Sequence, residues 1–153
     1  MAKVREKVMN QCKVAFEIIK KANGYNTDVM TISRIPKEYF GLVEPQFPAL
    51  FVSDLGVEVP VDQSDPAAIV HRVQIEIQGH FRDRSPEISS NFNAFYADIK
   101  KVIYAPIVFE DPPGTKYADH VLFIGMEVQS ESPPDILFRV QFTLDYWFNK
   151  AAP

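Results

Sequence analysis

The chain has 153 residues, a net charge of -4 and a sequence pI near 5.4, which fits one domain with a real hydrophobic core. It is 46% hydrophobic and 24% charged, as soluble globular proteins are, and it has no apolar run of the ~18 residues that a membrane span needs. Residues 1–7 mix charges and lack the apolar segment of a secretory signal, so we expect the product to stay in the cytoplasm. No basic stripe is present, which argues against direct nucleic-acid binding.

The first half of the chain predicts one helix and two short strands. Apolar residues recur at three- and four-residue steps from Val4 to Ala22, and Gly24 is a good stop for that helix. Alternation over residues 29–35 predicts a strand that Pro36 ends. A loop over residues 36–47, a short buried strand over 49–53 and a second, acidic loop over 54–68 then follow.

The second half predicts three strands and one helix. Alternation over residues 69–79 gives a half-buried strand, and residues 79–84 link it to a helix that Ser85 and Pro86 begin as N-cap and first residue. That helix ends before Pro106, and a loop over residues 106–118 follows. Strands over residues 121–129 and 136–148, joined by a turn with two prolines, should form an antiparallel hairpin.

The element order is therefore α-β-β-β-α-β-β. We predict a single α+β domain over residues 1–153, with a mainly antiparallel sheet and two helices packed on one face of it.

Residue types that carry chemistry are scattered along the chain. Cys12, the single cysteine, lies among apolar neighbours of the first helix, so a buried packing residue is favoured over a catalytic thiol. His71, His80 and His120 lack zinc-ligand spacing and are expected to be structural or solvated. The sequence shows no glycine-rich phosphate loop and no nucleophile elbow, and its acidic loop over residues 54–68 lacks EF-hand spacing. We expect no enzyme, no cofactor and no metal site.

The long loops and the polar side of the last strands favour a protein interface instead. Long loops in a compact domain are often functional, and these loops carry aromatic residues, which interfaces favour. Polar residues on the strands form a face that can line a channel or meet another subunit, and the charged residues 80–84 offer a further contact. The candidate subunit or partner contacts are Tyr39, Phe40, Arg72, Glu76, Arg82, Asp83, Phe109, Tyr117, Arg139 and Asp145.

Three stretches resemble the tail terminator (tail-completion) proteins of long-tailed bacteriophages. The first runs from the N-terminal helix through residues 24–34 to residues 47–52. The second joins the strand over residues 72–79 to the helix segment 95–102, and the third is the closing strand over residues 138–146. Together they span nearly the whole chain in the order of that family.

The resemblance implies an α/β fold and a structural role in the virion. Such proteins form a ring, usually of six subunits, that caps the tail tube, stops its polymerisation and provides the surface for head-to-tail joining. The implied partners are other copies of the chain, the tail tube protein and the head-connector or neck protein, while DNA passes through the ring without being read. The implied location is the tail or neck of the virion, assembled in the host cytoplasm.

Two other functions stay open on the sequence alone. One is another neck, head-completion or tail-tube protein, and a tube subunit would polymerise into long cylinders. The other is a small enzyme or ligand-binding module, which would need a pocket that brings His71 or His120 beside a buried carboxylate.

Overall fold

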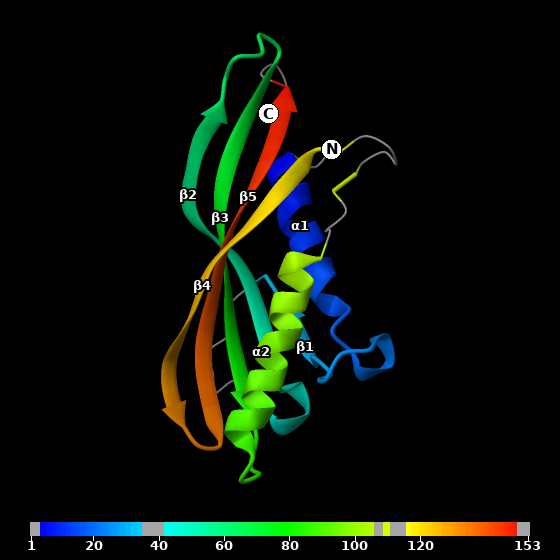
Figure 1. Ribbon diagram of the computed structural model, residues 1–153, viewed down its shortest axis with the longest axis vertical. Helices are drawn as coiled ribbons and strands as arrows, with labels where there is room; N and C mark the ends of the chain where they lie inside the picture. Colours follow the sequence, from blue (N-terminus) through cyan, green and yellow to red (C-terminus); the bar gives the residue numbers. More distant parts are fainter. Residues whose placement is uncertain (1–3, 35–41, 106–108, 111–115, 150–153) are drawn as a thin grey trace.

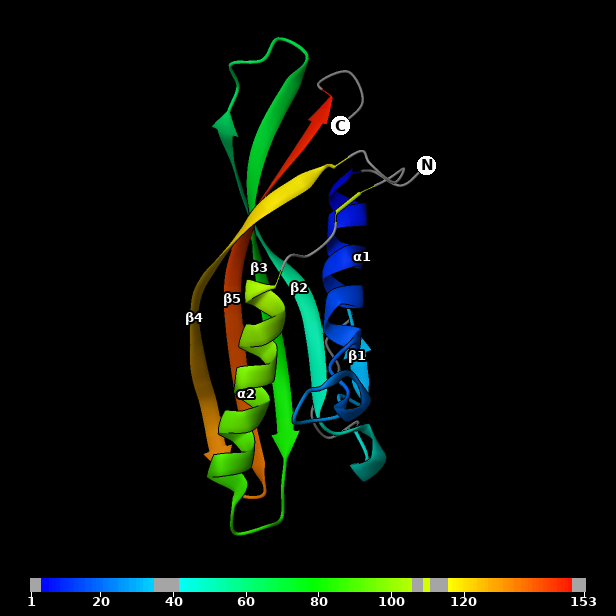
Figure 2. The same cartoon turned by 45° about the vertical axis from the view of Figure 1, so that its right-hand side comes forward.

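The computed structural model describes residues 4–34, 42–105, 109–110 and 116–149, apart from the side chain of His120. Within these ranges the chain forms two layers, a long twisted sheet and two helices that lie along one side of it (Figures 1 and 2). The elements in chain order are α1 (Val4–Glu17), β1 (Thr31–Ser33), β2 (Ala49–Asp62), β3 (Ala68–Arg82), α2 (Ile88–Tyr104), β4 (Ala118–Ser132) and β5 (Asp135–Asn149). The predicted α+β class and element order are confirmed.

The sheet has five strands in the order β1-β2-β3-β5-β4. The short β1 runs parallel to β2, and every other pair of neighbours is antiparallel, including the predicted β4–β5 hairpin. We call the side under the helices the inner face and the opposite side the outer face. Because side chains alternate along a strand, residues paired across two strands lie on the same face, and the register assigns each one.

The core lies between the inner face and the helices. α1 contributes its apolar stripe, including Val8, Cys12 and Phe16, and α2 contributes Phe95 and Ile99. The sheet contributes alternate residues of its central strands, as the periodicity predicted for β5. These are Val73, Ile75, Ile77, Phe138, Val140, Phe142 and Leu144, all buried.

The backbone of Gly79 on β3 lies directly against the ring of Phe138 on β5. A Cβ built on Gly79 would lie 2.1 Å from Cζ of Phe138, its neighbour on β5. Only glycine therefore leaves room for that buried ring.

The segment after α1 ties the two helices together. α1 ends earlier than predicted, at Glu17, and a separate 3-10 turn over Lys21–Asn23 ends at Gly24, whose φ of 86° is a left-handed conformation. The buried Asp98 of α2 then accepts hydrogen bonds from the backbone and side-chain nitrogens of Asn26 at 3.0 Å. The segment after α1 thus reverses the chain direction and also contacts α2.

β2 and β3 are longer than the sequence predicted. The acidic loop expected over residues 54–68 is wrong, because β2 continues to Asp62 through a bulge between Asp54 and Glu58. Gly56, with a φ of 70°, allows that bulge. The link expected over residues 79–84 is wrong as well, since β3 continues to Arg82.

Three further boundaries differ from the predictions. α2 begins at Ile88, because Ser85 donates its side-chain hydroxyl to Asp83 instead of capping the helix. β1 covers only three residues, Thr31–Ser33, and β4 begins at Ala118 rather than at residue 121.

Candidate protein interface

The two ends of the outer face differ in what covers them. At the end near the β4–β5 turn, Leu42 and Phe47 pack over Ala49 and Phe51 of β2 as a small second core. At the opposite end β2, β3 and β5 extend beyond the helices (Figures 1 and 2). We call this end, residues 55–62, 68–72 and 145–149, the arm.

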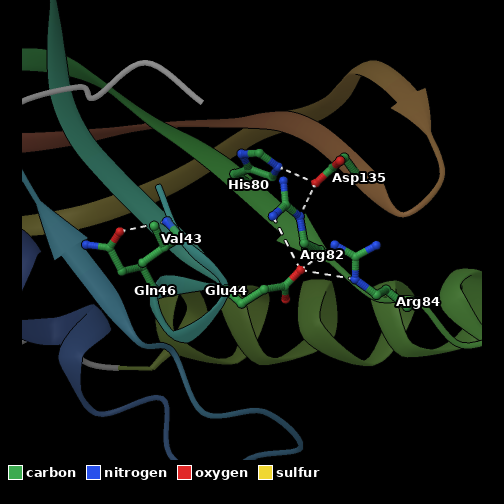
Figure 3. Close-up of polar contacts among 7 residues, drawn as sticks. All are labelled: Val43, Glu44, Gln46, His80, Arg82, Arg84 and Asp135. Carbon is green, nitrogen blue, oxygen red and sulfur yellow. Dashed lines mark hydrogen bonds and ion pairs between the residues drawn. The ribbon is translucent and has the colours of Figure 1, made fainter. Parts of the chain in front are cut away.

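A polar clamp holds the cover at the first end (Figure 3). Glu44, in the 3-10 turn Glu44–Gln46, accepts hydrogen bonds from Arg84 at 2.5 Å and from Arg82 at 3.5 Å. Arg82 also donates to Asp135 at 2.7 Å, and the buried His80 lies 2.7 Å from the same carboxylate oxygen. The clamp therefore ties residues 42–47 to the ends of β3 and β5.

Electrostatics keep the clamp charged. Partial burial raises the pKa of Asp135, but the hydrogen bonds from Arg82 and His80 lower it more, so this pKa falls below its ordinary value. The hydrogen bond from Arg84 lowers the pKa of Glu44 in the same way. The Arg82 guanidinium also lies 4.1 Å from the ring centre of Phe47, a cation–π contact.

Two predicted interface residues, Arg82 and Asp83, have internal roles here. Arg82 belongs to the clamp, and Asp83 accepts hydrogen bonds from the backbone and hydroxyl of Ser85 and from Asn91 at 2.6 to 3.0 Å. Their partners lie within the chain, so we leave both residues out of the candidate interface.

A polar strip crosses the middle of the outer face and unites four predicted residues. Arg72 donates two hydrogen bonds to Asp145 on β5, at 2.8 and 3.0 Å. Glu76 is 4% exposed, and it accepts from Gln78 and Gln141 at 3.1 and 3.0 Å. Arg139 lies 3.8 Å from Glu76 and donates to Glu127 on β4 at 2.6 Å. Each of the four residues thus has a charged or amide partner on its own or a neighbouring strand.

Beside the strip, the outer face of the arm is apolar. Val57, Val59 and Val61 of β2 are 47 to 49% exposed. Val59 pairs with Arg72 of the strip, which places Val59 on the outer face, while Val57 and Val61 lie within the two register shifts of β2. Val70 of β3 pairs with Trp147 of β5 on the same face, and both are half-buried. We call these residues, Val57, Val59, Val61, Val70 and Trp147, the arm patch.

Two of the predicted loop aromatics, Phe109 and Tyr117, do not lie on the surface. Phe109 and Tyr117 are buried, and their rings pack 6.1 Å apart against the core between helices and sheet. This corrects the expectation that both residues meet a partner, because their side chains belong to the core of the chain. Tyr39 and Phe40 lie outside the described residues.

One histidine lies beside a carboxylate on the inner face of the arm. His71 Nδ1 is 2.8 Å from Oε2 of Glu58, and Tyr146 donates its hydroxyl to the other oxygen at 2.7 Å. A nearby cleft of about 340 Å³ is lined by Arg5, Glu6, Met9, Arg34 and Asp54. Neither His71 nor Glu58 is among the residues that line this cleft.

Cys12 is fully buried, as predicted, and this burial raises the pKa of its thiol to about 12. Among the described residues there is no group of three or more metal-ligating side chains. No helix in the described ranges is long and apolar enough to cross a membrane.

Comparison with known proteins gives little beyond the fold. No protein-family model matches the chain, and no curated protein sequence matches it. Solved structures do match, and 32 of their chains are similar to it. One belongs to a structure described as the virion of a native gene transfer agent particle, with 15% identity and a TM-score of 0.45 over 78% of this chain and 79% of that one. A likeness of this size carries no argument about function.

Proposed function

We propose that the chain is a structural protein of a phage-like virion that acts as a tail terminator. In this role several copies, six in the related family, close a ring on the end of the tail tube, stop its growth and provide the surface for the head connector. DNA would pass through the ring without sequence readout. The proposed role is structural rather than catalytic, and it needs no cofactor.

The observation that carries this proposal is the arm patch. Val57, Val59 and Val61 of β2 are each about half exposed, and Val70 of β3 lies next to Trp147 of β5, the single tryptophan of the chain. Contiguous apolar surface of this kind marks a protein contact, and tryptophan is enriched among the residues that dominate such contacts. The neighbouring polar strip is internally satisfied, so it can be covered by a partner without leaving a charge unpaired.

The family resemblance supplies the kind of partner. It covers the N-terminal helix and residues 24–52, then residues 72–79 and 95–102, and then the closing strand over residues 138–146. In the structure, residues 72–79 of β3 and residues 138–146 of β5 lie on neighbouring strands of one sheet. The patch and the resemblance together favour a protein that works by joining other proteins.

Electron microscopy of the purified chain with tail tubes of the same virus tests the proposal. We expect rings in the sample without tubes and a single ring at one end of each tube. In a tube-growth assay, added chain should stop elongation. Long cylinders formed by the chain alone would instead identify a tube subunit, and a chain that leaves tube ends bare would contradict the terminator role.

A further inference from the structure

Three polar side chains on the inner face of the arm lie directly behind the arm patch. They are Glu58 of β2, His71 of β3 and Tyr146 of β5, one from each strand of the arm. Glu58 pairs across the strands with Val73, which lies on the inner face. His71 is two residues from Val73 and pairs with Tyr146, so all three point away from the arm patch. We call Glu58, His71 and Tyr146 the hub.

Glu58 is the centre of the hub. One of its carboxylate oxygens lies 2.8 Å from Nδ1 of His71, and the other accepts a hydrogen bond from the hydroxyl of Tyr146 at 2.7 Å. Arg5 of α1 lies 3.8 Å from Glu58 and forms an ion pair with Asp54, just before the arm, at 2.9 Å. The carboxylate of Glu58 therefore connects all three strands of the arm and, through Arg5, the first helix.

The surroundings of the hub favour these bonds. The side chains of Glu58 and His71 are only 19% and 20% exposed. The ring of Phe148 packs edge-on against the ring of His71, with their centres 4.9 Å apart. Burial and the hydrogen bond to Glu58 raise the pKa of Tyr146, so its hydroxyl keeps its proton and stays a donor. Hydrogen bonds to a charged acceptor that is shielded from water are stronger than exposed ones.

The hub lies where β2 is irregular. The bulge between Asp54 and Glu58, with Gly56 in a left-handed conformation, interrupts the pairing of β2 with β3 where the arm begins. A bulge bends its strand. Beyond this point the arm extends past the helices, which therefore do not cover it (Figures 1 and 2). Bonds between the strands of the arm have to maintain its arrangement there.

Each hub residue is also the chain neighbour of an arm-patch residue. The neighbours are Glu58 and Val59 on β2, Val70 and His71 on β3, and Tyr146 and Trp147 on β5. Successive side chains of a strand point to opposite faces of the sheet. Bonds within the hub, behind the sheet, therefore restrain the relative positions of three patch residues in front of it.

We propose that Glu58 is a positioning residue for the arm patch. It holds the three strands in the arrangement that a partner meets, and it does not touch that partner. The inference rests on the proposed contact through the arm patch and names the residue that sets its geometry. A surface already held in its bound arrangement loses less freedom on association. If the arm without Glu58 adopts this arrangement about one tenth of the time, the apparent affinity falls about 10-fold.

Distances between two spin labels on the full chain measure the arrangement of the arm directly. Gln63→Cys carries one label between β2 and β3, at the end of the arm, and Asn93→Cys carries the other on α2. Both positions are exposed, whereas Cys12 is fully buried and stays unlabelled. We expect a narrow distribution of distances when Glu58 is present and a broad one in Glu58→Ala.

The matched control is Glu17→Ala. It removes the same charge from an ion pair between Glu17 and Lys13 on α1, away from the arm, so its distances should stay narrow. In sedimentation velocity, with and without tail tubes, Glu58→Ala should assemble about 10-fold more weakly than Glu17→Ala, although both have an intact arm patch. Glu58→Gln should recover part of this loss, because its amide oxygen still accepts the hydroxyl of Tyr146.

Two results would overturn the inference. One is a distance distribution in Glu58→Ala as narrow as in the control, with only the melting temperature lowered, because Glu58 would then act on stability alone. The other is equal assembly of Glu58→Ala and Glu17→Ala. A broad distribution in Glu58→Ala, combined with a wild type that never sits on tail tubes, would leave the effect of Glu58 on the arm standing and remove the terminator role.

Discussion

The two ends of the sheet are built from the same strands, but both faces are covered at one end and the outer face is open at the other. At the clamp end, helices cover the inner face and residues 42–47 cover the outer one, so Phe51 on the outer face of β2 is only 2% exposed. Ten residues or fewer along the same strand, Val57, Val59 and Val61 stand about half exposed on the arm. Apolar side chains of the same strand are thus buried at one end and about half exposed at the other.

This difference shows why buried and exposed valines have to be judged by position. A valine inside a core contributes through the apolar area that it removes from water. A valine on an open face contributes nothing comparable until a second protein covers it. The clamp end should therefore determine folding stability, and the arm should determine association.

The largest effect expected at the clamp end comes from Gly79→Ala. The added methyl would overlap the buried ring of Phe138, and overpacking of this kind costs about 3 kcal/mol. Urea denaturation of the two proteins measures the difference. Gly125→Ala is the control, because its Cβ would meet nothing within 4 Å, and it should stay within about 0.5 kcal/mol of the wild type. Equal losses in both variants would contradict the tight approach at Gly79.

Two valines on β2 compare a position on the covered inner face with one on the open outer face. Val52→Ala removes buried methyl groups and should cost about 2 kcal/mol, while Val59→Ala on the arm should cost less than about 0.5 kcal/mol. The measurement is the free energy of unfolding at a protein concentration too low for association. A Val59→Ala loss as large as that of Val52→Ala would mean that the arm belongs to the folding core.

The smallest effect concerns the clamp and pH. Because the folded-state pKa of Asp135 is lowered, the ionised carboxylate stabilises the fold above its ordinary pKa, and this contribution is lost as pH falls through the lowered value. The melting temperature of Asp135→Asn should therefore fall less steeply than that of the wild type between about pH 5 and pH 2. Parallel curves would show that the clamp contributes nothing to acid stability.

The regular parts of the fold could be predicted from the sequence. Alternation over residues 136–148 and the helical steps of both helices reflect one buried side each, and packing in the structure follows them. The polar strip could be predicted in part, since alternation places Arg72 and Glu76 on one face of their strand and Arg139 and Asp145 on one face of theirs. Their pairing was not visible, because it depends on the register between β3 and β5, which are far apart in the chain.

The arm was missed because its local signals conflict. Asp54, Gly56 and Pro60 are typical of a loop, and they outweighed the alternation of Val57, Val59 and Val61. In the structure the glycine serves a bulge and the proline lies on an edge strand, both of which a strand tolerates. The alternation of Val57, Val59 and Val61 was the one sequence pattern that could have predicted the extension of β2 to Asp62.

Hydrogen–deuterium exchange of the assembled and dissociated protein tests most directly whether the arm is left for a partner. On assembly, we expect slower exchange in peptides from residues 55–62 and 145–149 of the arm. Peptides from residues 44–50 at the clamp end should exchange at the same rate in both samples. Protection confined to the clamp end, with an unchanged arm, would contradict the account.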